Sequence, residues 1–117
     1  IRTEVAIHDE FTLDTNTLIP LGLILTELFT NSAKYVEPPD GKPVEFKVEA
    51  YISTTGLTIL AADNGPGIPS QENSSLSDLA STDGIGLTLV ENLVEQIDGD
   101  ITIEPPPGFC VRLKLPL

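Results

Sequence analysis

The stretch Asp63-Asn64-Gly65-Pro66-Gly67-Ile68-Pro69 decides how the rest of this sequence is interpreted. It follows an apolar run, residues 57–62, that is typical of a buried strand. Two glycines let the backbone approach a ligand closely, and two prolines stiffen the exit from the turn. An ordinary tight turn would use the same dipeptides. An acid at this position also suits a flat ligand that forms hydrogen bonds. Other motifs in the sequence are needed to favour a ligand site over an ordinary turn.

The composition is that of one globular domain. The chain has 117 residues, of which 40% are hydrophobic, enough for one core but not for two. Eighteen acidic residues against six basic ones give a net charge of −12, and the basic residues are scattered along the sequence. Since a phosphate backbone would be repelled, we expect no nucleic acid among the partners.

Cysteine content and hydropathy bear on the cellular compartment. Cys110 is the only cysteine, so no internal disulfide can form, as is typical of intracellular proteins. The longest apolar run, residues 18–25, is interrupted by Pro20 and Gly22 and is shorter than the roughly 20 residues that cross a bilayer. No export signal is evident. We therefore expect a cytoplasmic domain that does not itself insert into a membrane, which leaves open a membrane anchor elsewhere in a parent protein.

Hydrophobic periodicity predicts short strands and two helices. The first two strands are expected around a turn at Asp9-Glu10, and the third and fourth are expected to pair as a hairpin. Asp14 to Asn16 offer caps for the first helix, and Gly99 is expected to stop the second. The predicted strands are residues 3–7, 11–13, 44–53, 57–63, 100–104 and 110–115. The predicted helices run from about residue 16 to 36 and from about 84 to 98.

A row of polar side chains follows one side of the first predicted helix. Glu27, Asn31 and Lys34 stand at i, i+4 and i+7, with Tyr35 beside them, so a carboxylate, an amide and an ammonium share a stripe. A solvated helix face would also carry Glu and Lys. Another stripe is apolar and is expected to face the core; its members are Leu21, Leu25, Leu28, Ser32 and Val36.

The second predicted helix opens at Gly84-Ile85-Gly86, after a Ser-rich loop over residues 70–83. Glycines at a helix start leave backbone N–H groups bare, and these donors and the helix dipole favour an anion. This motif is common and carries little weight by itself. It becomes informative because it follows the polar row and the acid-glycine turn along the sequence.

Together the three features resemble the ATP-binding domain shared by sensor histidine kinases, gyrase-type topoisomerases, heat-shock chaperone ATPases and mismatch-repair ATPases. Residues 27–35 resemble the N box of this family, residues 63–69 its first glycine box and residues 83–87 its second. The likeness runs from about residue 3 to Pro116. Within the family, the sequence of residues 20–25 and the closing Leu115-Pro116 are most similar to sensor histidine kinases. It implies an α+β fold: a two-layer α/β sandwich whose mixed, mostly antiparallel sheet of about five strands is covered on one face by two to three helices.

The resemblance also implies roles for individual residues. Asp63 would accept a hydrogen bond from the adenine amino group, Asn31 would hold Mg²⁺, and Glu27 would poise the incoming nucleophile or a metal-bound water. Lys34 would offset phosphate charge, and Tyr35 would line the nucleoside pocket. The expected catalytic residues are Glu27, Asn31 and Lys34. The expected ATP-binding residues are Asn31, Lys34, Tyr35, Asp63, Gly65, Gly67, Ile68, Gly84, Ile85, Gly86, Leu87 and Thr88.

By this resemblance, residues 1–117 form a single catalytic domain of a longer sensor kinase. It would transfer the γ-phosphoryl group of ATP to a histidine on a separate dimerisation domain, with a response regulator downstream. The alternatives are a serine kinase of the anti-sigma type on the same fold and a nucleotide-sensing domain without transfer. The chain departs from the family in three respects: the lid has no clear phenylalanine box, Cys110 stands where a threonine near adenine is frequent, and Asp83 precedes the phosphate-facing glycines.

Overall fold

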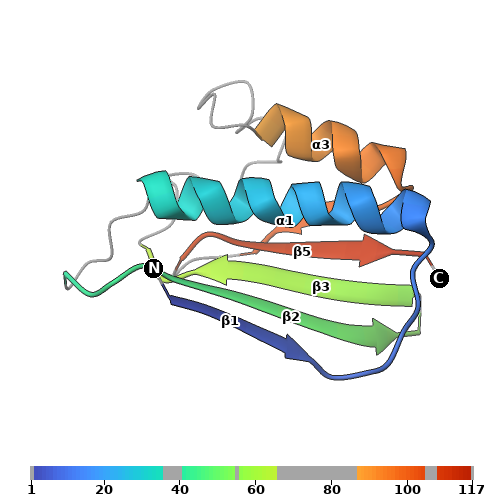
Figure 1. Ribbon diagram of the computed structural model, residues 1–117, viewed down its shortest axis with the longest axis horizontal. Coiled ribbons are helices and arrows are strands. Elements are labelled where there is room, and N and C mark those ends of the chain that lie inside the picture. Colours follow the sequence, from blue (N-terminus) through green and yellow to red (C-terminus); the bar gives the residue numbers. More distant parts are fainter. Residues whose placement is uncertain (1, 36–40, 55, 66–86, 105–107, 117) are drawn as a thin grey trace.

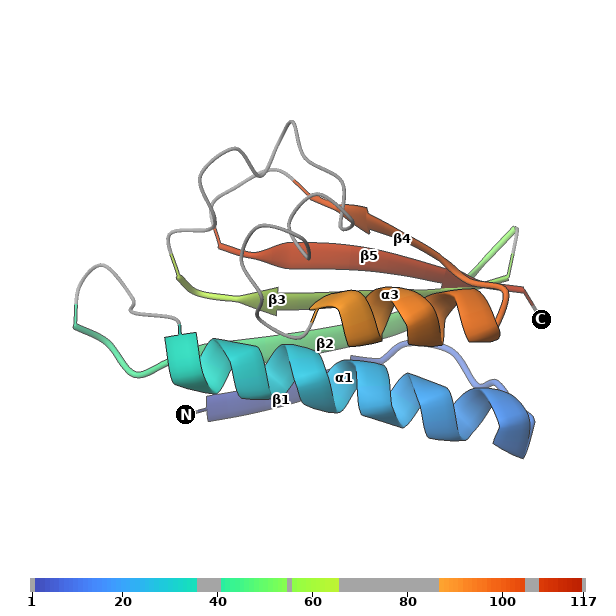
Figure 2. The ribbon, with the colours of Figure 1, turned by 90° about the horizontal axis from the view of Figure 1, so that it is seen from above.

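A single sheet and the helices on one of its faces make up the two layers of the protein (Figures 1 and 2). The computed structural model describes residues 2–35, 41–54, 56–65, 87–104 and 108–116. Within these residues the sheet has five strands in the order β1-β2-β3-β5-β4, and two helices cover it. The strands are β1 Arg2–Ile7, β2 Glu45–Ser53, β3 Gly56–Asp63, β4 Asp100–Ile103 and β5 Cys110–Leu115, and the helices are α1 Thr15–Tyr35 and α3 Leu87–Gln96.

The pairing of the strands confirms the predicted mixed, mostly antiparallel sheet. β1 pairs with β2 in parallel, and all other neighbours in the described sheet are antiparallel. The predicted hairpin is correct, with β2 and β3 in register from Phe46 opposite Asp63 to Ser53 opposite Gly56. A parallel pair needs a crossover connection, and α1 supplies it between β1 and β2.

The strand predicted over residues 11–13 is wrong. This segment connects the end of β1 to the start of α1 and pairs with no strand among the described residues. Phe11 and Leu13 alternate with polar residues because they are partly buried and pack against the core. Their spacing therefore reflects packing at the sheet edge and not a strand ladder.

Helix α1 begins as the sequence predicts, with Asp14 as its cap. The Asp14 Oδ1 atom accepts the backbone N–H of Asn16 at 2.8 Å, which satisfies one of the free donors of the first turn. Its buried face is rotated slightly from the predicted stripe: Leu21, Leu28 and Ser32 are buried, Leu25 is only partly buried, and Ile24, outside the predicted stripe, is fully buried. Val36 lies outside the described residues.

The core lies between the helices and one face of the sheet. On β5, Val111, Leu113 and Leu115 are buried while Lys114 is exposed, as their alternation predicts. The helices α1 and α3 run antiparallel over this face in both views (Figures 1 and 2). Further buried apolar side chains come from β2, β3, α3 and the residue that follows α3: Phe46, Val48, Ala50, Leu57, Ile59, Ala61, Val90, Leu93, Val94 and Ile97.

The end of α3 departs in detail from the prediction. Gly99 does help to close the helix, because its N–H bonds to the Val94 carbonyl at 2.9 Å while the Asp98 N–H bonds to the Glu95 carbonyl at 3.1 Å. This pair of bonds is a Schellman motif. The residue in the left-handed conformation, however, is Asp98, with φ 55°. Position 99 favours glycine for a different reason: a Cβ atom there would lie 2.8 Å from Leu115 Cδ2.

None of the helices in the described part of the chain is both long and apolar enough to span a membrane.

Candidate functional site

The carboxylate of Asp63 lies at the end of β3, on the helix-covered side of the sheet. Leu57, Ile59 and Ala61, at alternate positions before it, are buried on that side. Within the described part of the chain, three hydrogen bonds orient the carboxylate. Its Oδ1 accepts the backbone N–H groups of Gly65 and Phe109, each at 3.0 Å, and its Oδ2 accepts the Ser32 hydroxyl at 3.1 Å.

The chain just before β5 closes against Asp63. The backbone N–H of Asp63 donates to the Phe109 carbonyl at 3.1 Å. Gly108, with φ 77°, has no room for a side chain, because a Cβ atom there would lie 2.4 Å from the backbone oxygen of Asp63. In the sequence, Gly108 follows three prolines, a pattern typical of a turn. Its contact with β3 is long-range, so no local pattern indicated it.

Asn64 anchors the turn that follows Asp63. Its side-chain Oδ1 accepts the backbone N–H of Glu45 at 2.8 Å, and its Nδ2 donates to the Pro43 carbonyl at 3.0 Å. The Asn64 backbone N–H also donates to the Glu45 carbonyl at 3.2 Å. The start of the acid-glycine turn is thus fixed to β2, and Gly65 is buried. Gly67 and Ile68, both expected in the site, lie outside the described residues.

The C-terminal half of α1 approaches Asp63 through Ser32. Asn31 is the neighbouring residue; it is partly buried, and its Nδ2 is buried with no hydrogen-bond partner among the described residues. Glu27, one turn earlier, is also partly buried. Lys34 and Tyr35 belong to the last turn of α1, but their side chains lie outside what the structure describes. Two of the four residues of the predicted polar row can thus be placed with their side chains.

The second glycine motif is described only at its end. Gly84, Ile85 and Gly86 fall outside the described residues, Leu87 is the first residue of α3, and Thr88 is exposed in the first turn. The C-terminal end of β3, the C-terminal end of α1 and the N-terminal end of α3 point toward the same end of the molecule (Figures 1 and 2). A helix N-terminus at this end carries the positive end of its dipole.

Cys110, at the position where the family often has a threonine near adenine, is the first residue of β5. Its strand partner is Ala62, so its side chain projects toward the helix-free face, on the same side as Arg112. Burial, followed by the nearby Glu104 carboxylate, raises the pKa of the Cys110 thiol above its usual value. Phe109, one residue earlier, is the one that faces the core and the Asp63 side.

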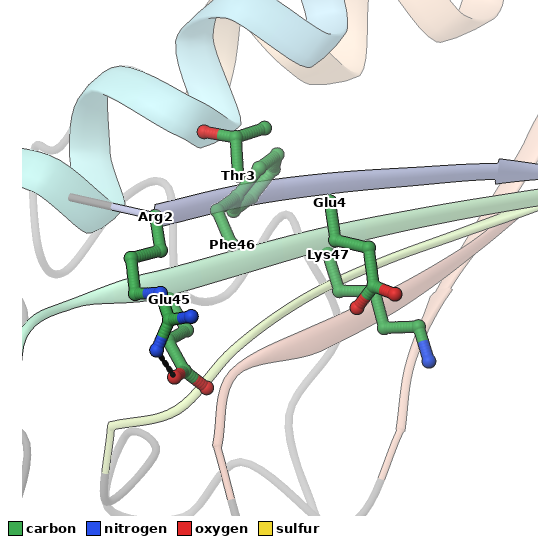
Figure 3. Close-up of a pocket in the computed structure, with 6 residues that line it drawn as sticks. All are labelled: Arg2, Thr3, Glu4, Glu45, Phe46 and Lys47. Atoms are coloured by element: carbon green, nitrogen blue, oxygen red, sulfur yellow. Dashed lines mark ion pairs between the residues drawn. The ribbon is translucent and has the colours of Figure 1, made fainter.

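A separate hollow of about 400 Å³ lies at the sheet edge formed by β1 and β2 (Figure 3). Thr3 and Phe46 project toward the helices, whereas the four charged side chains project to the other face (Figure 3). The two basic side chains among them are paired: Arg2 Nη1 lies 3.6 Å from Glu45 Oε1, and Lys47 Nζ lies 3.2 Å from Oε1 of Glu49, which is not one of the lining residues. Because its polar groups do not converge, this hollow is a weaker candidate for a ligand site than the surroundings of Asp63. Its lining residues are Arg2, Thr3, Glu4, Glu45, Phe46 and Lys47.

Sequence reasoning missed the role of Ser32. It was assigned to the apolar stripe of α1, and it is indeed buried, but its hydroxyl bonds to Asp63. A serine among leucines on a buried helix face was the available signal, because buried hydroxyl groups have hydrogen-bond partners.

Comparison with known proteins agrees with this arrangement. The family model described as histidine kinase-, DNA gyrase B- and HSP90-like ATPase matches residues 16–117. The chain therefore belongs to this ATPase family. The autoinducer 2 sensor kinase/phosphatase LuxQ of Vibrio vulnificus is 31% identical over 130 residues, which cover 95% of this chain and 15% of LuxQ. The sensor protein KdpD of Escherichia coli is 28% identical, over 80% of this chain and 11% of KdpD.

Solved structures show the same fold. The blue-light activated histidine kinase of Erythrobacter litoralis superposes with a TM-score of 0.79 at 19% identity, over 99% of this chain and 35% of that one. The ATP-binding domain of PrrB from Mycobacterium tuberculosis gives a TM-score of 0.71 at 23% identity, over 97% of this chain and 79% of that one. The predicted α+β sandwich is thereby confirmed. The chain spans only about 15% of the length of the LuxQ relative.

Proposed function

We propose that this chain is the ATP-binding catalytic domain of a two-component sensor histidine kinase. It transfers the γ-phosphoryl group of ATP to a histidine on a separate dimerisation domain of the same parent protein, and a response regulator acts downstream. The observation that carries the proposal is the carboxylate of Asp63, held by three donors beside the α1 turn that contains Asn31. Family membership and the sensor kinase names of the relatives support it.

Asp63 is suited to select adenine. The described groups that hydrogen-bond to its carboxylate are donors, so the carboxylate acts as an acceptor. Adenine presents an amino group at position 6, whereas guanine presents a carbonyl oxygen there. A fixed acceptor on the protein therefore favours the first base and leaves the second with two acceptors facing one another.

The amide of Asn31 fits the phosphate and metal end of the ligand. Its unpartnered Nδ2 is a donor, which suits a phosphate oxygen, and its oxygen suits Mg²⁺. Among the described residues no cluster of three His, Cys, Asp or Glu side chains could hold a metal by itself. Bound Mg²⁺ would neutralise phosphate charge. Glu27 would orient the attacking group, and Lys34, with the N–H groups at residues 84–87, would contact the phosphates.

Two other functions use the same fold. A serine kinase of the anti-sigma type would modify a partner protein, and a nucleotide sensor would bind ATP without transfer. Two relatives are named as sensor histidine kinases, which favours transfer to histidine over both of these alternatives. We place the domain in the cytoplasm, where ATP is found, and leave a membrane anchor to other parts of the parent protein.

The central test is ATP binding measured by isothermal titration calorimetry with excess Mg²⁺. Asp63→Asn replaces an acceptor-only group by one that also carries donors, so ATP affinity should fall at least about tenfold. Asp100→Asn, at an exposed position on β4, makes the same chemical change away from the site and should leave affinity unchanged. Undiminished binding to Asp63→Asn would refute the assigned site. Phosphoryl transfer from radiolabelled ATP to a histidine-bearing dimerisation domain, and not to serine, tests the reaction.

A further inference from the structure

The hydroxyl of Ser32 makes a contact that helix chemistry alone does not require. Serine and threonine inside helices usually donate to the carbonyl four residues earlier, and Thr26 does so in this helix, to Gly22 at 2.8 Å. Ser32, which is only 4% exposed, instead bonds to Asp63 Oδ2 at 3.1 Å. The bond joins α1 to the end of β3, 31 residues later in the chain.

The hydrogen bonds that the described residues make to Asp63 do not use every acceptor position of its carboxylate. A carboxylate can accept about four hydrogen bonds, two at each oxygen. The N–H groups of Gly65 and Phe109 both go to Oδ1, and the Ser32 hydroxyl takes one acceptor position of Oδ2. As far as the described residues go, one acceptor position of Oδ2 therefore remains, on the atom that Ser32 orients.

We infer that Ser32 is a positioning residue that aims this remaining acceptor of Asp63 at the 6-amino group of the purine, and so sets the selectivity of the site for adenine. The inference rests on the proposed function, because it assigns a role toward the same base. The two N–H bonds restrain Oδ1, and Ser32 supplies the hydrogen bond that the described residues make to Oδ2, so without the hydroxyl the small rotations of the carboxylate about its Cβ–Cγ bond are restrained at Oδ1 alone. The amino group of the base then meets an acceptor that is less well directed.

The test compares two nucleotides that differ in the contacted group. ATP carries the 6-amino group, whereas purine riboside triphosphate lacks it and retains the rest of the ligand. Calorimetric dissociation constants for both, with excess Mg²⁺, give a selectivity ratio for each variant of the 117-residue chain. Ser32→Ala should weaken ATP roughly 5- to 10-fold and the analogue less than twofold, since one charge-assisted hydrogen bond is affected.

Three further variants separate positioning from packing. Ser32→Cys has nearly the same shape but a weak donor and should behave like Ser32→Ala. Ser32→Thr retains the hydroxyl and should keep the ratio of the unmodified chain. Thr26→Ala removes an exposed hydroxyl that is satisfied within the same helix and should change neither affinity. Thermal unfolding of each variant confirms that the compared proteins are folded.

The outcomes distinguish this inference from the proposal on which it rests. If the unmodified chain prefers ATP but Ser32→Ala and Ser32→Cys keep that preference, or lose both nucleotides equally, the role of Ser32 is overturned and the adenine site stands. If the unmodified chain binds both nucleotides equally, or neither, the assignment of Asp63 to adenine is overturned and the role of Ser32 with it.

Discussion

Gly108 lies so close to Asp63 that a Cβ atom on it would come within 2.4 Å of the Asp63 backbone oxygen. The neighbouring Phe109 N–H donates to the Asp63 carboxylate, so the same close approach that excludes a side chain also delivers a donor. The start of β5 and the end of β3 therefore depend on each other.

Replacing Gly108 by alanine should loosen this approach. The residue has φ 77°, where a side chain is strained, and the obstructing atom belongs to the backbone and cannot rotate away. We expect the free energy of unfolding to fall by roughly 1–3 kcal/mol and ATP affinity to fall with it. Denaturant unfolding and calorimetry measure the two effects. Gly22→Ala is the control: it lies in α1 with nothing within 4 Å, so it should stabilise the protein by about 0.5–1 kcal/mol. Equal stability of the two variants would contradict this account.

Asp98 occupies the left-handed position that ends α3, at φ 55°, where glycine is usual. Asp98→Gly should raise the free energy of unfolding by about 0.5–1 kcal/mol, because it relieves backbone strain and removes an acidic side chain near the negative end of the helix dipole. Asp98→Asn separates the two causes, since it removes the charge and keeps a side chain. Denaturant midpoints of the three proteins give the comparison. A less stable Asp98→Gly variant would mean that a contact of the Asp98 carboxylate stabilises the protein by more free energy than the backbone strain costs.

Local patterns predicted the elements whose periodicity is strong. The cap at Asp14, the β2–β3 hairpin and the buried alternation of β5 all follow from nearest-neighbour chemistry. The segment of Phe11 was misassigned because alternation alone does not distinguish a paired strand from a connection that packs its apolar residues inward.

The parts of the site that were missed depend on long-range contacts. Asp63 could be proposed from the sequence because an acid beside glycines is a local pattern. Ser32 and Gly108 act on Asp63 from 31 and 45 residues away, and only the fold brings them together. Each did carry a weak signal, a serine on a leucine stripe and a glycine after three prolines. Neither pattern indicates which distant residue Ser32 or Gly108 contacts in the fold.

Cys110 should react slowly with alkylating reagents. Burial, then the Glu104 carboxylate, raises the pKa of its thiol above the ordinary 9.0. Since the thiolate is the reactive form, iodoacetamide should modify the folded protein more slowly than it modifies the denatured protein at pH 8. The neutral thiol is favoured in the folded state. Its contribution to stability is therefore complete below the unfolded pKa and is lost as pH rises through the folded pKa. Mass spectrometry over pH 7 to 10 follows the reaction, and equal rates in native and denatured protein would exclude the raised pKa.

ATP binding should depend strongly on Mg²⁺. The triphosphate brings about three or more negative charges to a chain whose own net charge is −12, and residues 63–98 contain no Lys or Arg. The compensation must then come from the metal ion, from Lys34 and from backbone N–H groups, of which the metal ion carries the largest charge. We expect excess chelator to weaken ATP at least about tenfold while adenosine, which lacks the phosphates, is little affected. Calorimetry with both ligands, with and without chelator, makes the comparison. If ATP binds equally well without Mg²⁺, the phosphates are neutralised by protein groups and the role assigned to Asn31 is wrong.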